Sequence, residues 1–179
     1  MRTELIVRNQ STWTKLVLFV PEQQEWDETA CSHFPKTCQL LRKIPELHIV
    51  STVSTRAGMA LWGGEMVAEG VSQHRVVPGE LGIFRMGPES ALVPHTGSTN
   101  LRLTAHLPLV VPGESRLEVG RESVGWKEGE VVIFDDSFIH SAENFHPTED
   151  RWVLLLNFFK PGVCRLPDHS CTTHLKWKN

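Results

Sequence analysis

Residues 94–107 have the sequence PHTGSTNLRLTAHL, and the second half alternates between apolar and polar side chains as a β-strand does. One side of this strand would carry Leu101, Leu103, Ala105 and Leu107, and the other side Arg102, Thr104 and His106. A polar side of this kind faces either solvent or a wet pocket. We therefore expect a strand with polar side chains on one of its faces.

Further strands are expected on both sides of this segment. From about residue 50 onward, glycine and proline separate short apolar stretches at regular intervals, which is typical of an antiparallel barrel or sandwich. Glu130–Phe134 is predicted to be a strand, and the long apolar run Arg151–Phe159 predicts another that is buried on both faces. Leu5–Val7 and Lys15–Val20 are expected as early strands or edge segments.

One helix is predicted, over residues 34–44, where apolar side chains recur at helical spacing. Pro35 suits its first turn and Pro45 would stop it. The length of 179 residues indicates a single domain. Within it we expect strands and a helix over 1–49, a β core over 50–162 and a polar tail over 163–179. Residues 62–78 are weakly patterned and are expected to form a loop or insertion at the mouth of the barrel.

The composition is that of a soluble globular protein, with 40% apolar and 22% charged residues. A net charge of −3 without a basic block gives no indication of nucleic acid or an anionic membrane as a partner. Apolar runs are strand-sized, so no membrane span is expected. The N-terminus lacks a convincing signal peptide, which favours a cytoplasmic location.

The four cysteines are Cys31, Cys38, Cys164 and Cys171, and no two of them form a C-x-x-C pair. A structural zinc knuckle is therefore not expected. A disulfide between Cys31 and Cys38 is disfavoured, because residues two turns apart on one helix lie too far apart to bridge. The cysteines are expected to be reduced and mostly packed.

His95 and His140 are the best candidates for metal ligands. Neutral imidazole is a good ligand for iron, and the usual non-haem iron triad combines two histidines with one carboxylate. That carboxylate commonly sits two residues after the first histidine, where this chain has Gly97. Either this is not a metal site, or two imidazoles hold the metal and the remaining ligands come from water and cosubstrate.

Longer motifs around these histidines resemble the aspartyl/asparaginyl β-hydroxylase family. The similar stretches are residues 94–107, residues 126–140 with the sequence WKEGEVVIFDDSFIH, and the following Arg151. The helical segment Cys31–Glu46 is also similar to the segment that precedes the barrel in that family. The resemblance spans residues 30–162, and its long continuous motifs make it far more specific than a lone H-x-G.

The resemblance implies an Fe(II)/2-oxoglutarate-dependent dioxygenase. The implied fold is mainly β, a double-stranded β-helix (jelly-roll, cupin-like) with a flanking N-terminal helix. The family lacks the triad carboxylate, which accounts for Gly97. By position, His95 and His140 match the iron ligands, Arg151 matches the residue that pairs with the distal carboxylate of 2-oxoglutarate, and His106 matches a contact of the other carboxylate.

The chain also departs from the family pattern. Thr104 stands where the family commonly has a second arginine, and Arg85 stands where the preceding strand commonly has a serine. We hypothesise that Arg85 supplies the positive charge that Thr104 lacks. Arg102 is a further candidate for contact with the cosubstrate, or a surface residue. Asp136, four residues before His140, is expected to support a ligand histidine or an iron-bound water.

The expected reaction is hydroxylation of an aspartyl or asparaginyl β-carbon, with Fe(II), 2-oxoglutarate and O2. The substrate would be a peptide, a protein or a free amino acid, and another small molecule or a lipid remains open. One alternative is an iron/2-oxoglutarate halogenase, in which a small residue at the carboxylate position leaves room for chloride. The other is a catalytically inactive, cupin-like binding module. The sequence does not predict the oligomeric state.

Overall fold

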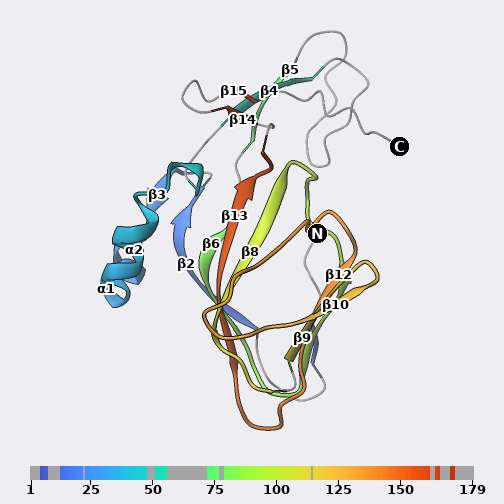
Figure 1. The fold of residues 1–179 in the computed structure, drawn as a ribbon. Helices are drawn as coiled ribbons and strands as arrows, with labels where there is room; N and C mark the ends of the chain where they lie inside the picture. Colours follow the sequence, from blue (N-terminus) through green and yellow to red (C-terminus); the bar gives the residue numbers. More distant parts are fainter. Residues whose placement is uncertain are drawn as a thin grey trace.

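The computed structural model of the chain consists mainly of two antiparallel sheets that face each other (Figure 1). It describes residues 5–7, 13–21, 23–47, 51–55, 72–76, 79–113, 115–161, 164–165 and 170–171. No helix in this described part of the chain has both the length and the apolar character that crossing a membrane requires.

The two main sheets differ in size. The five-stranded sheet has the order β1 (Leu5–Val7), β7 (Ser90–His95), β12 (His140–Asn144), β9 (Ser115–Val119) and β10 (Glu122–Gly125). The six-stranded sheet has the order β11 (Val132–Phe134), β8 (Arg102–Val110), β13 (Arg151–Phe159), β6 (Leu81–Met86), β2 (Thr14–Val20) and β3 (Glu25–Trp26). Two further ladders pair β4 (Ser51–Thr55) with β5 (Ser72–Val76), and β14 (Cys164–Arg165) with β15 (Ser170–Cys171).

The chain crosses between the two main sheets repeatedly from β6 to β13. Side chains from both sheets meet in a buried inner cluster of Met86, Leu117, Trp126 and Ala142. This alternation of antiparallel strands around a shared interior is the arrangement of a jelly roll. The prediction of a mainly β, cupin-like double-stranded β-helix is confirmed.

Most predicted strands are present. Arg151–Phe159 forms β13 with the predicted bounds, and the alternating segment forms β8. Thr104 and His106, on the polar side of β8, are buried, so this side faces the interior and not solvent. The predicted strand over 130–134 is shorter, because β11 begins at Val132.

Two predicted loop regions contain strands. β5 lies inside the segment 62–78 that was expected to be a loop, and it pairs with β4. The rest of that segment, apart from these strand residues, lies outside the described residues. β14 and β15 lie inside the predicted polar tail and pair with each other, while most of the tail also lies outside the described residues.

The predicted single helix is two short helices, α1 (Glu28–His33) and α2 (Pro35–Leu41), followed by a 3-10 turn at Pro45–Leu47. Asp27 caps the N-terminus of α1, and its side chain accepts a hydrogen bond from the Ala30 N–H at 2.9 Å. The chain breaks at Phe34, with φ −132° and ψ 54°. A residue before proline is disfavoured in the helical region, and here Pro35 follows.

This break corrects the prediction about the cysteines. Cys31 on α1 and Cys38 on α2 form a disulfide, with Cα atoms 5.7 Å apart. The sequence prediction assumed one continuous helix, in which the two residues would be too far apart. The turn at Phe34 brings them within the bridging range.

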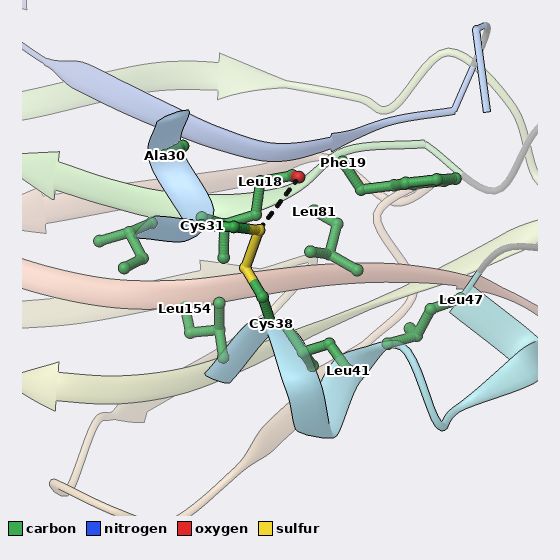
Figure 2. Packing of buried hydrophobic residues seen from close by; sticks show 10 residues of the cluster. Leu18, Phe19, Ala30, Cys31, Cys38, Leu41, Leu47, Leu81 and Leu154 are labelled. Atoms are coloured by element: carbon green, nitrogen blue, oxygen red, sulfur yellow. Dashed lines mark hydrogen bonds between the residues drawn. A yellow bond between two sulfur atoms is a disulfide. The ribbon is translucent and has the colours of Figure 1, made fainter. Parts of the chain in front are cut away.

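Both helices cover the outer face of the six-stranded sheet. The disulfide lies in an outer cluster of buried residues: Leu18, Phe19, Ala30, Cys31, Cys38, Leu41, Leu47, Leu81, Ile83 and Leu154. Figure 2 shows the bridge between the leucines of the sheet and those of the helices. This apolar layer covers the side of the sheet that faces away from the inner cluster.

Candidate functional site

The two predicted ligand histidines meet at one place in the five-stranded sheet. His95 is the last residue of β7, His140 is the first residue of β12, and the two are direct partners across these paired strands. Their ring centroids are 4.2 Å apart, with the ring planes at 51°. The sheet register therefore brings together two imidazoles that are distant in the sequence.

Both rings are held in the same way. Nδ1 of His95 lies 2.8 Å from the carbonyl oxygen of Val93, and Nδ1 of His140 lies 2.9 Å from the carbonyl oxygen of Phe138. Since a carbonyl only accepts, Nδ1 must donate in each case, and the neutral ring then has its lone pair on Nε2. The pKa of His140 is lowered, mainly because burial disfavours the charged form. These features suit metal ligation through Nε2.

Gly97 has no room for a side chain. A Cβ at this position would lie 2.4 Å from Oδ2 of Asp136. Its backbone N–H donates to the carbonyl oxygen of Asp136 at 2.6 Å. The space in which a triad carboxylate would begin is therefore filled by Asp136. In the described part of the chain, no group of three or more His, Cys, Asp or Glu side chains is placed to hold a metal ion.

Asp136 is buried and paired with Arg102. Nε and Nη2 of Arg102 donate to Oδ2 of the carboxylate at 3.0 and 2.9 Å. Oδ1 of the same carboxylate is buried and has no partner in the structure. The arginine that was a candidate for cosubstrate contact thus orients the acid beside Gly97, which leaves one carboxylate oxygen available.

The loop between β11 and β12, which carries Asp136, is held at its first residue. Asp135 accepts hydrogen bonds from the backbone and the hydroxyl of Ser137 and forms an ion pair with Lys160. Burial raises the pKa of Asp135, but the bonds from Lys160 and Ser137 outweigh it, so the pKa is lowered. These contacts fix the approach of the chain to His140.

Arg151 is buried on the inner side of β13, and no acidic side chain among the described residues forms an ion pair with it. Its partner across the ladder is Met86 of the inner cluster, and directly opposed residues share one face of a sheet. Its Cζ lies 4.1 Å from the ring centroid of Trp126. Nε and Nη1 are buried without hydrogen-bond partners in the structure. Burial lowers the pKa of Arg151 to about 9, so the group is still charged at neutral pH.

His106 connects Arg151 with the histidine pair. Its ring stacks on Trp126 at 5.9 Å and meets Phe134 edge-on at 5.1 Å, and Phe134 lies 5.4 Å from His140. Burial and, secondarily, the charge of Arg151 lower the pKa of His106 to about 3, so this imidazole is neutral at physiological pH. Its Nδ1 is buried and has no partner in the structure.

Arg85 lies elsewhere. Its ladder partner on β13 is Trp152, which packs against the outer cluster, so Arg85 points to the opposite side of the sheet from Arg151. Its Nε and Nη2 donate to both oxygens of Asp150 at 2.6 and 2.7 Å. The hypothesis that Arg85 replaces a missing arginine at the site therefore has no support in the geometry, because consecutive residues of β6 alternate in direction.

Thr104 does lie on the inner side. Its hydroxyl accepts a hydrogen bond from Nδ2 of Asn157 at 2.7 Å, and Oδ1 of Asn157 accepts from the backbone of Glu80 at 2.9 Å. The sequence prediction gave no role to Asn157 or Trp126. Asn157 lies in a clear strand pattern, but only the pairing of β8 with β13 places it opposite Thr104. Trp126 follows β10, and only its packing places it beside His106 and Arg151.

The chain is similar in sequence to known proteins of one family. A family model described as aspartyl/asparaginyl beta-hydroxylase matches residues 64–161. The chain belongs to the aspartyl/asparaginyl β-hydroxylase family. It is 35% identical over 137 residues to the human aspartyl/asparaginyl beta-hydroxylase, which covers 76% of this chain and 14% of that protein. It is 37% identical over 78 residues to aspartate beta-hydroxylase domain-containing protein 2 of Xenopus tropicalis, covering 42% and 21%.

This family member also has distant structural neighbours. The cupin domain of Cnp3 from Schizosaccharomyces pombe has a TM-score of 0.38 at 10% identity and covers 62% of this chain and 88% of that chain. A predicted oxalate decarboxylase from Thermotoga maritima has a TM-score of 0.38 at 22% identity, covering 45% and 66%. The sheet order itself defines the fold of this hydroxylase-family chain.

Proposed function

We propose that the chain is an Fe(II)/2-oxoglutarate-dependent dioxygenase that hydroxylates the β-carbon of an aspartyl or asparaginyl residue in a peptide, or of a related small substrate. The observation that carries this proposal is the buried guanidinium of Arg151, whose Nε and Nη1 atoms have no hydrogen-bond partner in the described residues. An unpaired buried charge is costly, and a carboxylate ligand would offset that cost. Ring contacts through His106 and Phe134 connect this anion site with the histidine pair.

The histidine pair fits iron. His95 and His140 would hold Fe(II) through their Nε2 atoms, and Gly97 adds no third protein ligand. When bound, the iron supplies the activation of O2, in which 2-oxoglutarate is oxidised to succinate and CO2 while one oxygen atom is inserted into a substrate C–H bond. A site with only two protein ligands leaves more positions for water and the cosubstrate.

The remaining residues would bind the cosubstrate or orient the side chains around it. Arg151 would pair with the distal carboxylate of 2-oxoglutarate, in a charge-assisted contact that is often bidentate. His106, neutral at physiological pH, would offer a hydrogen bond to the cosubstrate without adding charge. Asp136 would accept a hydrogen bond at its unpaired Oδ1, in a position fixed by Arg102. Arg102 therefore acts through Asp136 and not on the cosubstrate.

The two alternatives receive less support. A halogenase requires an open place for chloride beside the iron, and here the carboxylate of Asp136 fills the space next to Gly97 and would repel an anion. An inactive binding module would not need two neighbouring histidines whose Nδ1 atoms both donate to carbonyl oxygens, which directs the lone pair to Nε2. The matched part of the chain corresponds to 14% of the human relative's length.

The compartment is also a proposal. The sequence favoured the cytosol, but the Cys31–Cys38 disulfide weighs against it, because structural disulfides persist mainly in oxidising compartments. We infer an oxidising environment for this chain.

Succinate formation tests the proposal. The purified chain should form succinate only with Fe(II), 2-oxoglutarate and O2 together, and a hydroxylated peptide should gain 16 mass units against 34 for chlorination. His95→Ala and His140→Ala should abolish turnover, whereas His33→Ala, a change of an exposed side chain of α1, should not. Succinate formation that is unchanged in both ligand variants would refute the site. Ligand binding without any turnover in the wild type would favour the inactive module.

A further inference from the structure

Trp126 combines burial, an unpaired donor and contact with both predicted cosubstrate residues. It follows β10, belongs to the inner cluster and is 7% exposed. Arg151 lies over its ring, and His106 stacks on it. Its indole Nε1 is buried without a hydrogen-bond partner in the structure. A tryptophan in this position usually satisfies its N–H.

The unpaired atoms are concentrated around this one ring. Besides Oδ1 of Asp136, the buried side-chain atoms that lack partners in the described residues are Nε1 of Trp126, Nε and Nη1 of Arg151, and Nδ1 of His106. Each buried donor left unpaired costs about 1–3 kcal/mol, and folded proteins contain few of them. Several at one point indicate a ligand rich in acceptors. A carboxylate offers two oxygens with about four lone-pair directions.

We propose that Trp126 is a third cosubstrate-binding residue, whose indole N–H donates to the carboxylate that Arg151 pairs with. This inference rests on the proposed function and adds a residue to its cosubstrate site. The competing explanation gives Trp126 only a supporting role, as an aromatic surface under the guanidinium. Trp126→Phe distinguishes the two explanations, because phenylalanine keeps an aromatic face and removes the N–H.

Trp126→Phe and Trp152→Phe form a matched pair of variants. Trp152 is partly buried on the opposite side of β13, against the outer cluster. Titration of the Fe(II)-loaded chain with 2-oxoglutarate under anaerobic conditions should show a dissociation constant raised about tenfold or more in Trp126→Phe, as expected for losing a hydrogen bond to a charged group. Trp152→Phe should change it less than about twofold, which is the scale of a substitution that touches no ligand.

A second ligand separates the N–H contact from general damage. A 2-oxo monoacid of similar length, such as 2-oxopentanoate, lacks the distal carboxylate. The wild type and Trp126→Phe should bind it equally, because the contact removed by the substitution does not exist there. An equal penalty for both ligands would overturn the proposal in favour of the supporting role.

A spectroscopic measurement covers the case in which Trp126→Phe does not fold. In the 15N-labelled wild type with a diamagnetic metal such as Zn(II), one indole N–H signal should move downfield on addition of 2-oxoglutarate. The same shifted signal should be present in the spectrum of Trp152→Phe, which lacks only the indole signal of Trp152. No shifted indole signal, with binding intact, would overturn the role of Trp126 alone. Failure of the wild type to bind 2-oxoglutarate would overturn the proposed function together with it.

Discussion

The two faces of the six-stranded sheet are formed by the same strands, but the side chains buried on them differ in polarity. On the outer face, Leu81, Ile83 and Leu154 pack under the helices and the disulfide. On the inner face, Arg151 and His106 are buried with unpaired nitrogen atoms. Neighbours in sequence, such as Arg151 and Trp152, lie on opposite faces because strand residues alternate.

The outer face contributes mainly to the stability of the fold, and the inner face carries the proposed ligand-binding groups. Burial of the outer leucines and the disulfide stabilises the fold. The inner face keeps desolvated donors whose cost in the free protein would be offset by the anion that we propose to bind there. Substitutions on the two faces should therefore change different measured quantities.

Arg151→Met should have the largest effect and should separate the two quantities. Loss of a charged hydrogen-bonding group of about 3 kcal/mol should weaken 2-oxoglutarate binding about 100-fold or more. The unfolding free energy of the ligand-free protein should not fall, because methionine removes a buried charge that pairs with no acid among the described residues. Calorimetric titration and urea unfolding measure the two effects, with exposed Arg116→Met as the control. A dissociation constant within tenfold of the wild type would contradict the assignment of the inner face.

Reduction of the Cys31–Cys38 disulfide should affect the outer face alone. Closing a loop with a sequence separation of 7 stabilises the fold by about 2.5 kcal/mol in the chain-entropy treatment. Urea unfolding with and without a reductant should show a loss of that size. A Cys31→Ala, Cys38→Ala double variant should be insensitive to the reductant, which excludes effects of the reductant on the other two cysteines. The folded, reduced protein should bind 2-oxoglutarate with an affinity within about twofold of the oxidised protein, since this change lies away from the ligand.

The stability of the ligand-free protein should fall in acid because of His106. Its pKa is about 3 in the fold against 6.5 ordinarily, so the unfolded chain binds a proton between these pH values while the folded chain does not. Stability then rises with pH across this window and falls as pH decreases below 6.5. From pH 7.5 to 5.5 this one residue should cost about 1.4 kcal/mol.

His106→Gln tests that contribution, because glutamine keeps a polar side chain and does not titrate. Urea unfolding of both proteins at the two pH values should show a smaller loss for the variant by about the same 1.4 kcal/mol. Equal losses in both proteins would mean that His106 is protonated in the fold at pH 5.5.

The features that the sequence predicted correctly have a signal in a short motif or in the periodic spacing of side chains. The bounds of β13 and the alternation of β8 follow from side-chain periodicity, and the histidine motif pointed to residues that the sheet register then brought together. The helix break at Phe34 had a local signal in Pro35 that was read as a helix start only, so the disulfide was missed. The contact of Trp126 with Arg151 depends on packing between distant segments, for which periodicity gives no signal.

Arg85→Ala should have the smallest effect and gives the finest test of the contrast between the faces. Arg85 pairs with Asp150, at 27% and 28% side-chain exposure, on the side away from Arg151. A partly exposed ion pair contributes about 1 kcal/mol or less, so the unfolding free energy should fall by no more than that. The dissociation constant for 2-oxoglutarate should stay within about threefold of the wild type, because Asp150 precedes Arg151 and only a small displacement of the guanidinium is expected. A tenfold weakening would instead favour the original hypothesis that Arg85 compensates for Thr104.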